Sequence, residues 1–320
     1  MVKLLFIALF MIFLINSQMV QNKHSEKIMN KSDPFVEVKH GEFVFNCRVA
    51  GLDNDGEAII LLHGFPETSH MWVDLLPILF NKNYRVIAPN QRGYSPKARP
   101  NNVKEYSIKK IAGDVIAIAD AFEIQRFHLV GHDWGSAIGW AVIALNPERV
   151  LSWTAMSVPH MKAFEYAYKK DKDQQKRSEY IGFFKLPFIP ELYFSWNKYS
   201  KLKNVWKESS EKQKEIYLDI FKQRGALRTA LNWYRANIGV RVKPEDQIKF
   251  DDVNVPSQLI WGNRDMALGR TGAELTENYM TGPYRLVELD AGHWLIQESF
   301  QEVSSAIIEH IEEHTQKRSK

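Results

Sequence analysis

Cysteine is almost absent from this sequence: among 320 residues the only one is Cys47. A lone thiol cannot form an internal disulfide, and it excludes metal sites that are built from several cysteines. Cys47 lies in the stretch FVFNCRVAG, in which apolar and polar residues alternate. This alternation favours a small residue within a β-strand over a reactive nucleophile.

An excess of charge of one sign is missing too, because 42 Lys and Arg residues stand against 38 Asp and Glu residues, for a formal net charge of +4. The richest basic runs, KKDKDQQKR (169–177) and EKQKE (211–215), mix both signs or include glutamines. Nucleic-acid binding requires a clustered basic patch, so these runs indicate solvated helix faces. We predict no nucleic-acid partner, and no motif indicates a metal ion or an organic cofactor.

Long apolar runs are scarce, and the longest lies at the N-terminus. Residues 4–15 are twelve consecutive apolar residues behind a single lysine. A spanning helix needs about 20 residues, so this run has the length of a signal-peptide core. We expect an exported, secreted chain with residues 1–17 as a signal peptide and 18–33 as a polar linker. Because INSQ is a poor cleavage site, the alternative is an uncleaved membrane anchor through residues 4–15.

The rest of the chain alternates between short apolar runs and helical stretches. Residues 35–51 alternate apolar and polar positions around a glycine, which predicts a β-hairpin. Helical patterns such as IKKIAGDVIAIADAF (108–122) separate several of the later runs. Short apolar strands separated by helices predict an α/β fold, with a mostly parallel sheet and helices on both faces. The predicted buried strands are 58–63, 84–89, 126–131, 150–156, 257–262 and 284–289.

This alternation stops after Met156. Residues 159–250 contain many aromatic and charged residues, and no apolar β-run separates their helical segments. The regular pattern resumes at VPSQLIWG (255–262). We therefore predict a helical cap, residues 159–250, inserted into a core that comprises residues 34–158 and 251–314.

A sharp strand-to-helix turn is predicted within LVGHDWGSAIGW (129–140). Gly131 and Gly135 permit a strained elbow and close packing of the strand against the helix. The residue at the apex, Asp133, is expected at the carboxyl end of the sheet, where open α/β sheets bind ligands. The alternative is that Asp133 caps the helix, a common role for aspartate. The paired glycines, and the positive helix end that favours an ionised carboxylate, indicate a nucleophile.

Further loops after predicted strands carry residues that can act with Asp133. The loop His63–Pro66 contains a glycine that lets the backbone approach a ligand closely. Asp265 follows one late strand and His293 follows the next, so the chain order of nucleophile, acid and base matches a hydrolase triad. Asp290 competes for the acid role, but it lies only three residues before His293 and is more typical of a turn.

These stretches together resemble the α/β-hydrolase fold family, and within it the aspartate-nucleophile branch of epoxide hydrolases and haloalkane dehalogenases. The similarity runs from residue 35 to residue 314 and keeps the family's order and spacing. The motif set is specific for the fold and for an aspartate nucleophile, and less specific for the reaction. It comprises HGFPETSHMW (63–72), APNQRGYS (88–95), GHDWGSAIGW (131–140), WGNRD (261–265) and AGHW (291–294).

The resemblance implies a role for each matching residue. Asp133 attacks a saturated carbon of the substrate and forms an alkyl-enzyme ester. His293, oriented by Asp265, activates the water that cleaves this ester. The backbone N–H groups of Phe65 and Trp134 hold the resulting oxyanion. A carboxylate suits this chemistry, because a serine would leave an ether that the same residues could not hydrolyse.

The cap distinguishes the two reactions that the resemblance implies. Epoxide hydrolases protonate the ring oxygen with cap tyrosines, whereas dehalogenases bind the halide with N–H donors of tryptophan or asparagine. ALNWYRANI (230–238) resembles the segment that carries one such tyrosine, which assigns this role to Tyr234. For the second tyrosine the nearest match is SEYIGFFKLP (178–187), in which Tyr180 and Phe183 compete for the position.

The sequence departs from the family pattern at the second cap tyrosine and at Asn90, whereas Phe65 agrees with the epoxide hydrolases. His160 is a possible substitute for a missing tyrosine, although a histidine at the junction of core and cap is more typical of a structural residue. Asn90 stands where the family often has an acid, and we interpret it as structural. Phe65 occupies a position where dehalogenases often have asparagine, which favours an epoxide hydrolase.

We therefore expect hydrolysis of a small apolar or aromatic epoxide to a vicinal diol. The alternative enzyme is a haloalkane or haloacid dehalogenase that uses Trp134 with Trp196 or Trp233. A non-catalytic ligand-binding relative is the alternative of another class, but a binding protein has no need for an intact triad. The sequence leaves the individual substrate and the oligomeric state open.

Overall fold

The computed structural model describes residues 35–241 and 243–315 of the chain. The predicted signal peptide or anchor (1–17) and the linker (18–33) lie outside these residues, so both stay predictions. Within the described ranges, no helix combines the length and the hydrophobicity that are needed to cross a bilayer.

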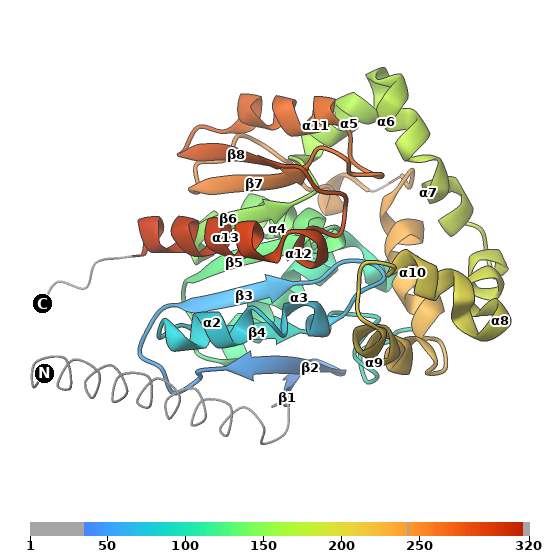
Figure 1. The fold of residues 1–320 in the computed structure, drawn as a ribbon, viewed down its shortest axis with the longest axis horizontal. Helices are drawn as coiled ribbons and strands as arrows, with labels where there is room; N and C mark the ends of the chain where they lie inside the picture. The colour runs from blue at the N-terminus through green and yellow to red at the C-terminus, as the bar shows by residue number, and fades with distance from the viewer. Residues whose placement is uncertain (1–34, 242, 316–320) are drawn as a thin grey trace, which may run out of the picture. The chain divides into compact units, whose positions relative to one another are not determined.

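An eight-stranded sheet with the strand order β1-β2-β4-β3-β5-β6-β7-β8 organises the described chain (Figure 1). β2 pairs with β4 in antiparallel orientation, and each pair from β4 to β8 is parallel. The strands are β1 (Phe35–His40), β2 (Phe43–Ala50), β3 (Ala58–Leu62), β4 (Arg85–Pro89), β5 (Phe127–His132), β6 (Val150–Met156), β7 (Ser257–Gly262) and β8 (Tyr284–Leu289). The prediction of a mostly parallel sheet is confirmed.

The apolar runs form strands because the sheet buries both of their faces. β3, β5, β6 and β7 are buried at every residue, which is why their sequences are continuous apolar runs rather than alternating ones. β1 and β2 are only partly covered and keep the alternation that predicted a hairpin. Cys47 lies on β2 with its side chain fully buried.

Helices cover both faces of this sheet. α4 packs against β3, β5, β6 and α3, whereas α13 packs against β6 and β7. Figure 1 shows α13 in front of the sheet and α4 behind it. The helices of the core are α2 (Leu76–Asn81), α3 (Ile108–Ala121), α4 (Trp134–Leu145), α11 (Arg270–Leu275), α12 (Leu295–Glu298) and α13 (Phe300–His314). Short 3-10 helices span Ser69–Trp72, Val103–Tyr106, Pro147–Arg149, Pro244–Asp246 and Thr276–Tyr279.

A helical insert follows β6 and ends before β7, as the loss of β-runs predicted. It contains α5 (Met161–Lys170), α6 (Lys172–Arg177), α7 (Glu179–Phe184), α8 (Ile189–Val205), α9 (Glu211–Phe221) and α10 (Ala226–Asn237). These helices gather beside the carboxyl ends of the strands (Figure 1). We call this insert the cap and the remaining chain the core; the boundaries at residues 159 and 250 stay predictions.

Candidate active site

A strained turn between β5 and α4 presents Asp133. Its backbone has φ 51° and ψ −121°, a conformation that non-glycine residues rarely adopt. Two glycines make the turn possible, because a Cβ on Gly131 would lie 2.4 Å from the carbonyl oxygen of Gly135. A Cβ on Gly135 would in turn lie 2.2 Å from the carbonyl oxygen of Leu62 on β3. The sequence-predicted elbow is therefore present, held by close backbone packing.

The side chain of Asp133 does not cap α4. It makes no capping hydrogen bond to α4. Its Oδ1 instead accepts the backbone N–H of Phe65 at 2.7 Å, and the backbone N–H of Trp134, at the start of α4, helps to lower the pKa of this carboxyl group. Gly64 leaves room for this contact, since a Cβ there would lie 2.3 Å from Oδ1. Two N–H groups converging on one carboxylate can also stabilise an oxyanion that forms at the same place.

His293 connects Asp133 with a second buried carboxylate. Its Nδ1 lies 2.9 Å from Oδ2 of Asp265, and its Nε2 lies 3.7 Å from Oδ2 of Asp133. The other oxygen of Asp265 accepts the backbone N–H groups of Ala267 at 2.7 Å and Leu268 at 3.0 Å. The structure thus brings together the three residues that the sequence singled out, in the order carboxylate, imidazole, carboxylate.

Asp290, the competing acid, lies outside this arrangement. Its side chain is 84% exposed and pairs with Arg264, with 3.0 Å between Oδ1 and Nε. A solvated carboxylate paired with an arginine cannot orient the buried imidazole of His293. The geometry therefore favours Asp265 as its partner.

Burial and neighbouring charges set the protonation of the triad. Burial raises the pKa of Asp133 above its ordinary 3.8, although His293 and the two N–H groups oppose that rise. Burial would lower the pKa of His293, but Asp265, Asp133 and Glu67 outweigh it and raise this pKa to about 9. Despite its burial, Asp265 has a lowered pKa because of the charge and hydrogen bond of His293 and the two N–H donors. Near neutral pH the raised pKa of His293 therefore favours an imidazolium beside the carboxylate of Asp265.

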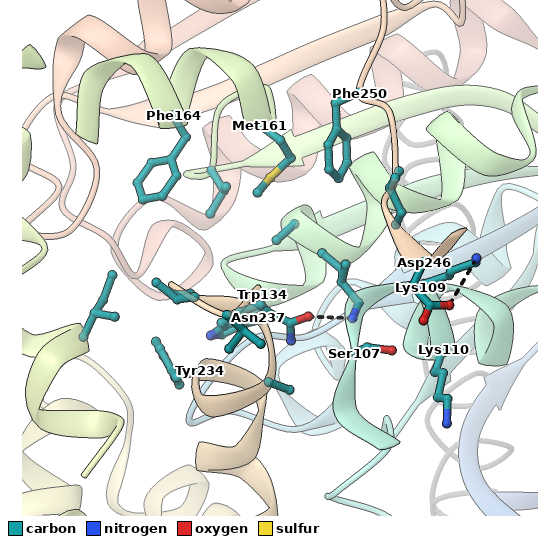
Figure 2. Close-up of a pocket in the computed structure, with 18 of the residues that line it drawn as sticks. Ser107, Lys109, Lys110, Trp134, Met161, Phe164, Tyr234, Asn237, Asp246 and Phe250 are labelled. Atoms are coloured by element: carbon teal, nitrogen blue, oxygen red, sulfur yellow. Dashed lines mark hydrogen bonds and ion pairs between the residues drawn. The ribbon is translucent and has the colours of Figure 1, made fainter. Parts of the chain in front are cut away.

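A cavity of about 740 Å³ opens over Asp133 between the core and the cap. Met161, Phe164 and Phe250 form one apolar wall, and Trp134 and Tyr234 lie together on another side (Figure 2). Another side is basic, lined by side chains that include Lys104, Lys110 and Arg241. The volume and the apolar lining are those of a site for a small organic molecule.

Two tyrosines of the cap line this cavity together with Asp133. Tyr234 lies on α10 and Tyr180 on α7, with ring centroids 6.2 Å apart and planes at 80°. Burial raises the pKa of Tyr234 well above its ordinary 10.0 and raises that of Tyr180 as well. Both phenols therefore stay protonated and can donate a proton. Phe183, the competitor of Tyr180, packs against Tyr193 instead, with ring centroids 5.4 Å apart.

Comparison with known proteins agrees with this geometry. A family model described as the alpha/beta hydrolase fold matches residues 57–300. The chain belongs to the α/β hydrolase fold family. Epoxide hydrolase 4 of Homo sapiens is 31% identical to it over 296 residues, which cover 89% of this chain and 80% of that protein. Within the family, this hydrolase is placed with the epoxide hydrolases, in the branch with an aspartate nucleophile.

Two further matches agree with the family, and the second of them is an epoxide hydrolase. The AB hydrolase superfamily protein YfhM of Bacillus subtilis (strain 168) is 32% identical over 265 residues, covering 80% of this chain and 91% of that protein. The crystal structure of an epoxide hydrolase from Bacillus megaterium, in complex with an inhibitor, has a TM-score of 0.77 at 25% identity. That match covers 87% of this chain and 100% of the other.

Two buried residues of the hydrolase site were missed by the sequence analysis. Glu67 is fully buried and accepts hydrogen bonds from Tyr217 and Gln297. His132 lies between Glu67 and the triad, with Nδ1 3.4 Å from Oε2 of Glu67 and Nε2 2.8 Å from the backbone oxygen of His293. Glu67 stands two residues after Phe65 and His132 stands directly before Asp133, both inside the motifs quoted above. That position was the signal that could have found them.

Other predicted residues have structural surroundings. Asn90 accepts the backbone N–H of Ser69 at 2.9 Å, as expected for a structural role. His160 is buried and stacks on Tyr279, with ring centroids 4.6 Å apart, and it is not among the residues that line the cavity. Among the described residues, one group could hold a metal ion: His310, Glu313 and His314 on α13, none of which lines the cavity.

The two cap tryptophans that a dehalogenase could use are unsuited to halide binding. Trp196 is 75% exposed on the outside of the cap. Trp233 is buried, but its indole N–H donates to the backbone oxygen of Arg92 at 2.9 Å. Trp134 lines the cavity, so its indole is the one of these three that faces a ligand.

Proposed function

We propose that this α/β hydrolase opens epoxides with water to give vicinal diols. The observation that carries the proposal is the cavity that places the carboxylate of Asp133 together with the protonated phenols of Tyr180 and Tyr234. A carboxylate can attack a saturated carbon, and a phenol can protonate the oxygen that leaves that carbon. Ring opening of an epoxide requires both groups at the same time.

The first step is alkylation of Asp133. With Oδ1 held by the N–H of Phe65, Oδ2 attacks one epoxide carbon and the bond from that carbon to the ring oxygen breaks. The ring oxygen takes a proton from Tyr234 or Tyr180 and becomes the first hydroxyl group of the product. The product of this step is an ester between Asp133 and the substrate, which remains in the cavity.

The second step is hydrolysis of that ester. His293 accepts a proton from a water molecule, whose oxygen attacks the carbonyl carbon of the Asp133 ester. The oxyanion lies where the N–H groups of Phe65 and Trp134 already converge. The bond between the acyl carbon and the substrate oxygen then breaks, and His293 returns its proton to the departing alkoxide, which leaves as the diol. The proton left on the carboxyl group of Asp133 passes to the tyrosinate formed in the first step, so Asp133 regains its charge. Esterification also prepares the base, because it removes the Asp133 charge that helps to raise the pKa of His293.

The substrate class proposed for this reaction is a small apolar or aromatic epoxide. Met161, Phe164 and Phe250 offer an apolar wall (Figure 2) in the cavity that Asp133 also lines. The volume of about 740 Å³ lies within the range of small-molecule sites.

Halide release is less well supported than ring opening. A dehalogenase needs two N–H donors that face the leaving halide, and only Trp134 of the three tryptophans considered above lines the cavity. The phenols of Tyr180 and Tyr234 would have no role in the displacement of a halide. A purely ligand-binding protein is also less well supported, because burying Asp133, Asp265 and His293 destabilises a fold that does not use them.

Trapping of the covalent intermediate tests the proposal. In His293→Gln, alkylation of Asp133 can proceed while hydrolysis of the ester is slowed. After incubation with an aryl epoxide, we expect the intact mass to rise by the mass of the epoxide, with the adduct mapped to Asp133. Asp133→Asn combined with His293→Gln is the matched control and should gain no mass. An adduct formed only with a haloalkane would instead establish the dehalogenase.

Export of the chain is also a proposal, based on the apolar run at residues 4–15. N-terminal sequencing of the mature protein tests it. A start near residue 18 supports cleavage of a signal peptide, whereas a start at Met1 contradicts it.

A further inference from the structure

The outer surface of the cap exposes large apolar side chains. Among the described residues, the three most exposed of these are Trp196 (75%), Leu192 (68%) and Phe188 (67%). Leu192 and Trp196 lie four residues apart, on one side of α8 up to its kink at Trp196, and Phe188 immediately precedes the helix. Together with Leu186, Ile189 and Tyr193, which are also exposed, they form what we call the α8 patch. Soluble monomers rarely expose contiguous apolar surface of this kind without a partner.

Both sides of this part of α8 are apolar, but only one has a protein partner. Pro190 and Phe194 are buried, and the Phe194 ring packs against Phe184 and Phe65 at centroid distances of 5.5 and 6.2 Å. Figure 1 shows α8 at the outer edge of the cap. One side of the helix thus packs on the loop that carries Phe65, while the other side faces outward.

The surroundings of the patch are basic. Residues 185–207 contain five lysines and one glutamate, a net charge of +4 for this segment. The glutamate, Glu191, is turned inward and pairs with Arg235 at 2.7 Å. Lys203 and Lys207 pair with acidic residues of the cap. A third lysine, Lys201, borders the patch directly, with its Nζ 5.8 Å from the ring centre of Tyr193.

We propose that the α8 patch docks onto the surface of a lipid bilayer that contains anionic lipids. Exposed tryptophan, tyrosine and aliphatic side chains flanked by lysines are the composition that binds at the boundary between headgroups and acyl chains. The lysines attract the anionic headgroups, and the apolar side chains enter the boundary region. A second copy of the chain fits less well, because a patch-to-patch contact would bring two basic segments together.

Docking of α8 has a consequence for the active site. Because Phe194 and Phe65 are in contact, the helix that meets the lipid also packs on the loop that holds Asp133. The enzyme would then work at the lipid surface, where apolar molecules are concentrated. The proposal does not depend on which reaction Asp133 performs.

An environment-sensitive fluorophore at position 196 of the full chain tests docking. The variant Trp196→Cys provides the attachment site, and Cys47 does not compete because it is buried with a pKa raised to about 12. Tyr166→Cys, on the exposed side of α5, carries the fluorophore in the matched control. The probes are vesicles of phosphatidylcholine with phosphatidylserine, and vesicles of phosphatidylcholine alone.

With anionic vesicles we expect a blue shift of the fluorophore at position 196 and none at position 166. The double variant Lys198→Glu/Lys201→Glu should weaken vesicle binding about tenfold, whereas the matched reversal Lys169→Glu/Lys170→Glu on α5 should not. Epoxide turnover in solution should be unchanged in all four lysine substitutions, which shows that the fold is intact.

Three outcomes would overturn the proposal. Vesicle binding without a shift at position 196 would show that another segment, such as residues 4–15, makes the contact. A shift that grows with protein concentration in the absence of vesicles would show that the patch joins two copies. Absence of vesicle binding would show that the patch remains in water.

Discussion

The core and the cap differ in how far their charged and aromatic side chains are exposed to solvent. In the core, the Arg92–Asp114 pair is nearly inaccessible, with side chains 4% and 3% exposed, and the triad is equally enclosed. In the cap, the corresponding bidentate pair of Arg235 and Glu191 is 12% and 18% exposed, and large aromatic residues reach the surface. Chemistry that depends on fixed charges therefore resides in the core, while the cap supplies neutral donors and apolar surface.

The largest expected effect distinguishes the two carboxylates near His293. Asp265→Asn should lower turnover of an epoxide by about 10⁴-fold, because the amide cannot stabilise the imidazolium that forms in the reaction. Asp290→Asn should leave turnover unchanged, since its carboxylate is exposed and pairs with Arg264. Steady-state kinetics of the two variants measure this difference. Equal losses in both would contradict the assignment of Asp265.

A second comparison measures the difference in burial between core and cap. Arg92→Met should destabilise the protein by about 3–5 kcal/mol, because it leaves the buried carboxylate of Asp114 without its partner. Arg235→Met should cost about 1–3 kcal/mol, since water reaches Glu191 in the cap. Urea unfolding of both variants gives the two values. A larger loss for the cap variant would reverse the proposed contrast.

The tyrosines test whether the cap acts only in ring opening. Tyr234→Phe and Tyr180→Phe should each slow alkylation of Asp133 by about 10²-fold, because each removes one proton donor. Neither should slow hydrolysis of the ester, which depends on His293 in the core. Rapid mixing that follows formation and decay of the alkyl-enzyme separates the two rates, and Tyr193→Phe, on the surface of the cap, is the control. Slower decay in the tyrosine variants would assign the cap a role in both steps.

The last expected effect concerns stability as a function of pH. The pKa of His293 is raised from 6.5 to about 9 in the folded core, so its contribution to stability is complete below pH 6.5 and is lost as the pH rises through 9. We expect a loss of up to about 3 kcal/mol across this range, the linkage value of that net shift, which already includes the opposing effect of burial. Urea midpoints across this range should show the loss in the wild type and a smaller one in His293→Gln. An unchanged wild-type midpoint would contradict the raised pKa.

The sequence predicted the core more completely than the cap. The strands were readable because complete burial imposes apolar runs, and the elbow was readable because backbone contacts at Gly131 and Gly135 exclude any side chain. Asp265 and His293 could be ranked by chain order and by their places directly after strands. Glu67 and His132 stand in the same motifs, but their contact with each other and with the backbone of His293 forms only once the chain is folded.

The cap was harder to predict because helix periodicity alone does not assign a side chain to a cavity. Tyr180 and Phe183 are three residues apart, so they project from similar sides of α7, and only the packing of the cap separates them. Tyr180 lines the cavity while Phe183 packs on Tyr193. The exposure of Trp196 was equally hidden, because α8 leaves helical geometry there, with φ −59° and ψ 147°.

The backbone oxygen of His293 accepts hydrogen bonds from two different strand ends. One comes from Nε2 of His132, the last residue of β5, at 2.8 Å, and the other from Oγ of Ser157, just after β6, at 3.3 Å. The loop that carries the base is therefore tied to the centre of the sheet through its main chain. Its amides should exchange with deuterium only when the whole sheet opens, while those of α8 exchange through local fraying. On heating, the protein should thus lose its lipid-facing edge first and keep a working triad until the sheet itself melts.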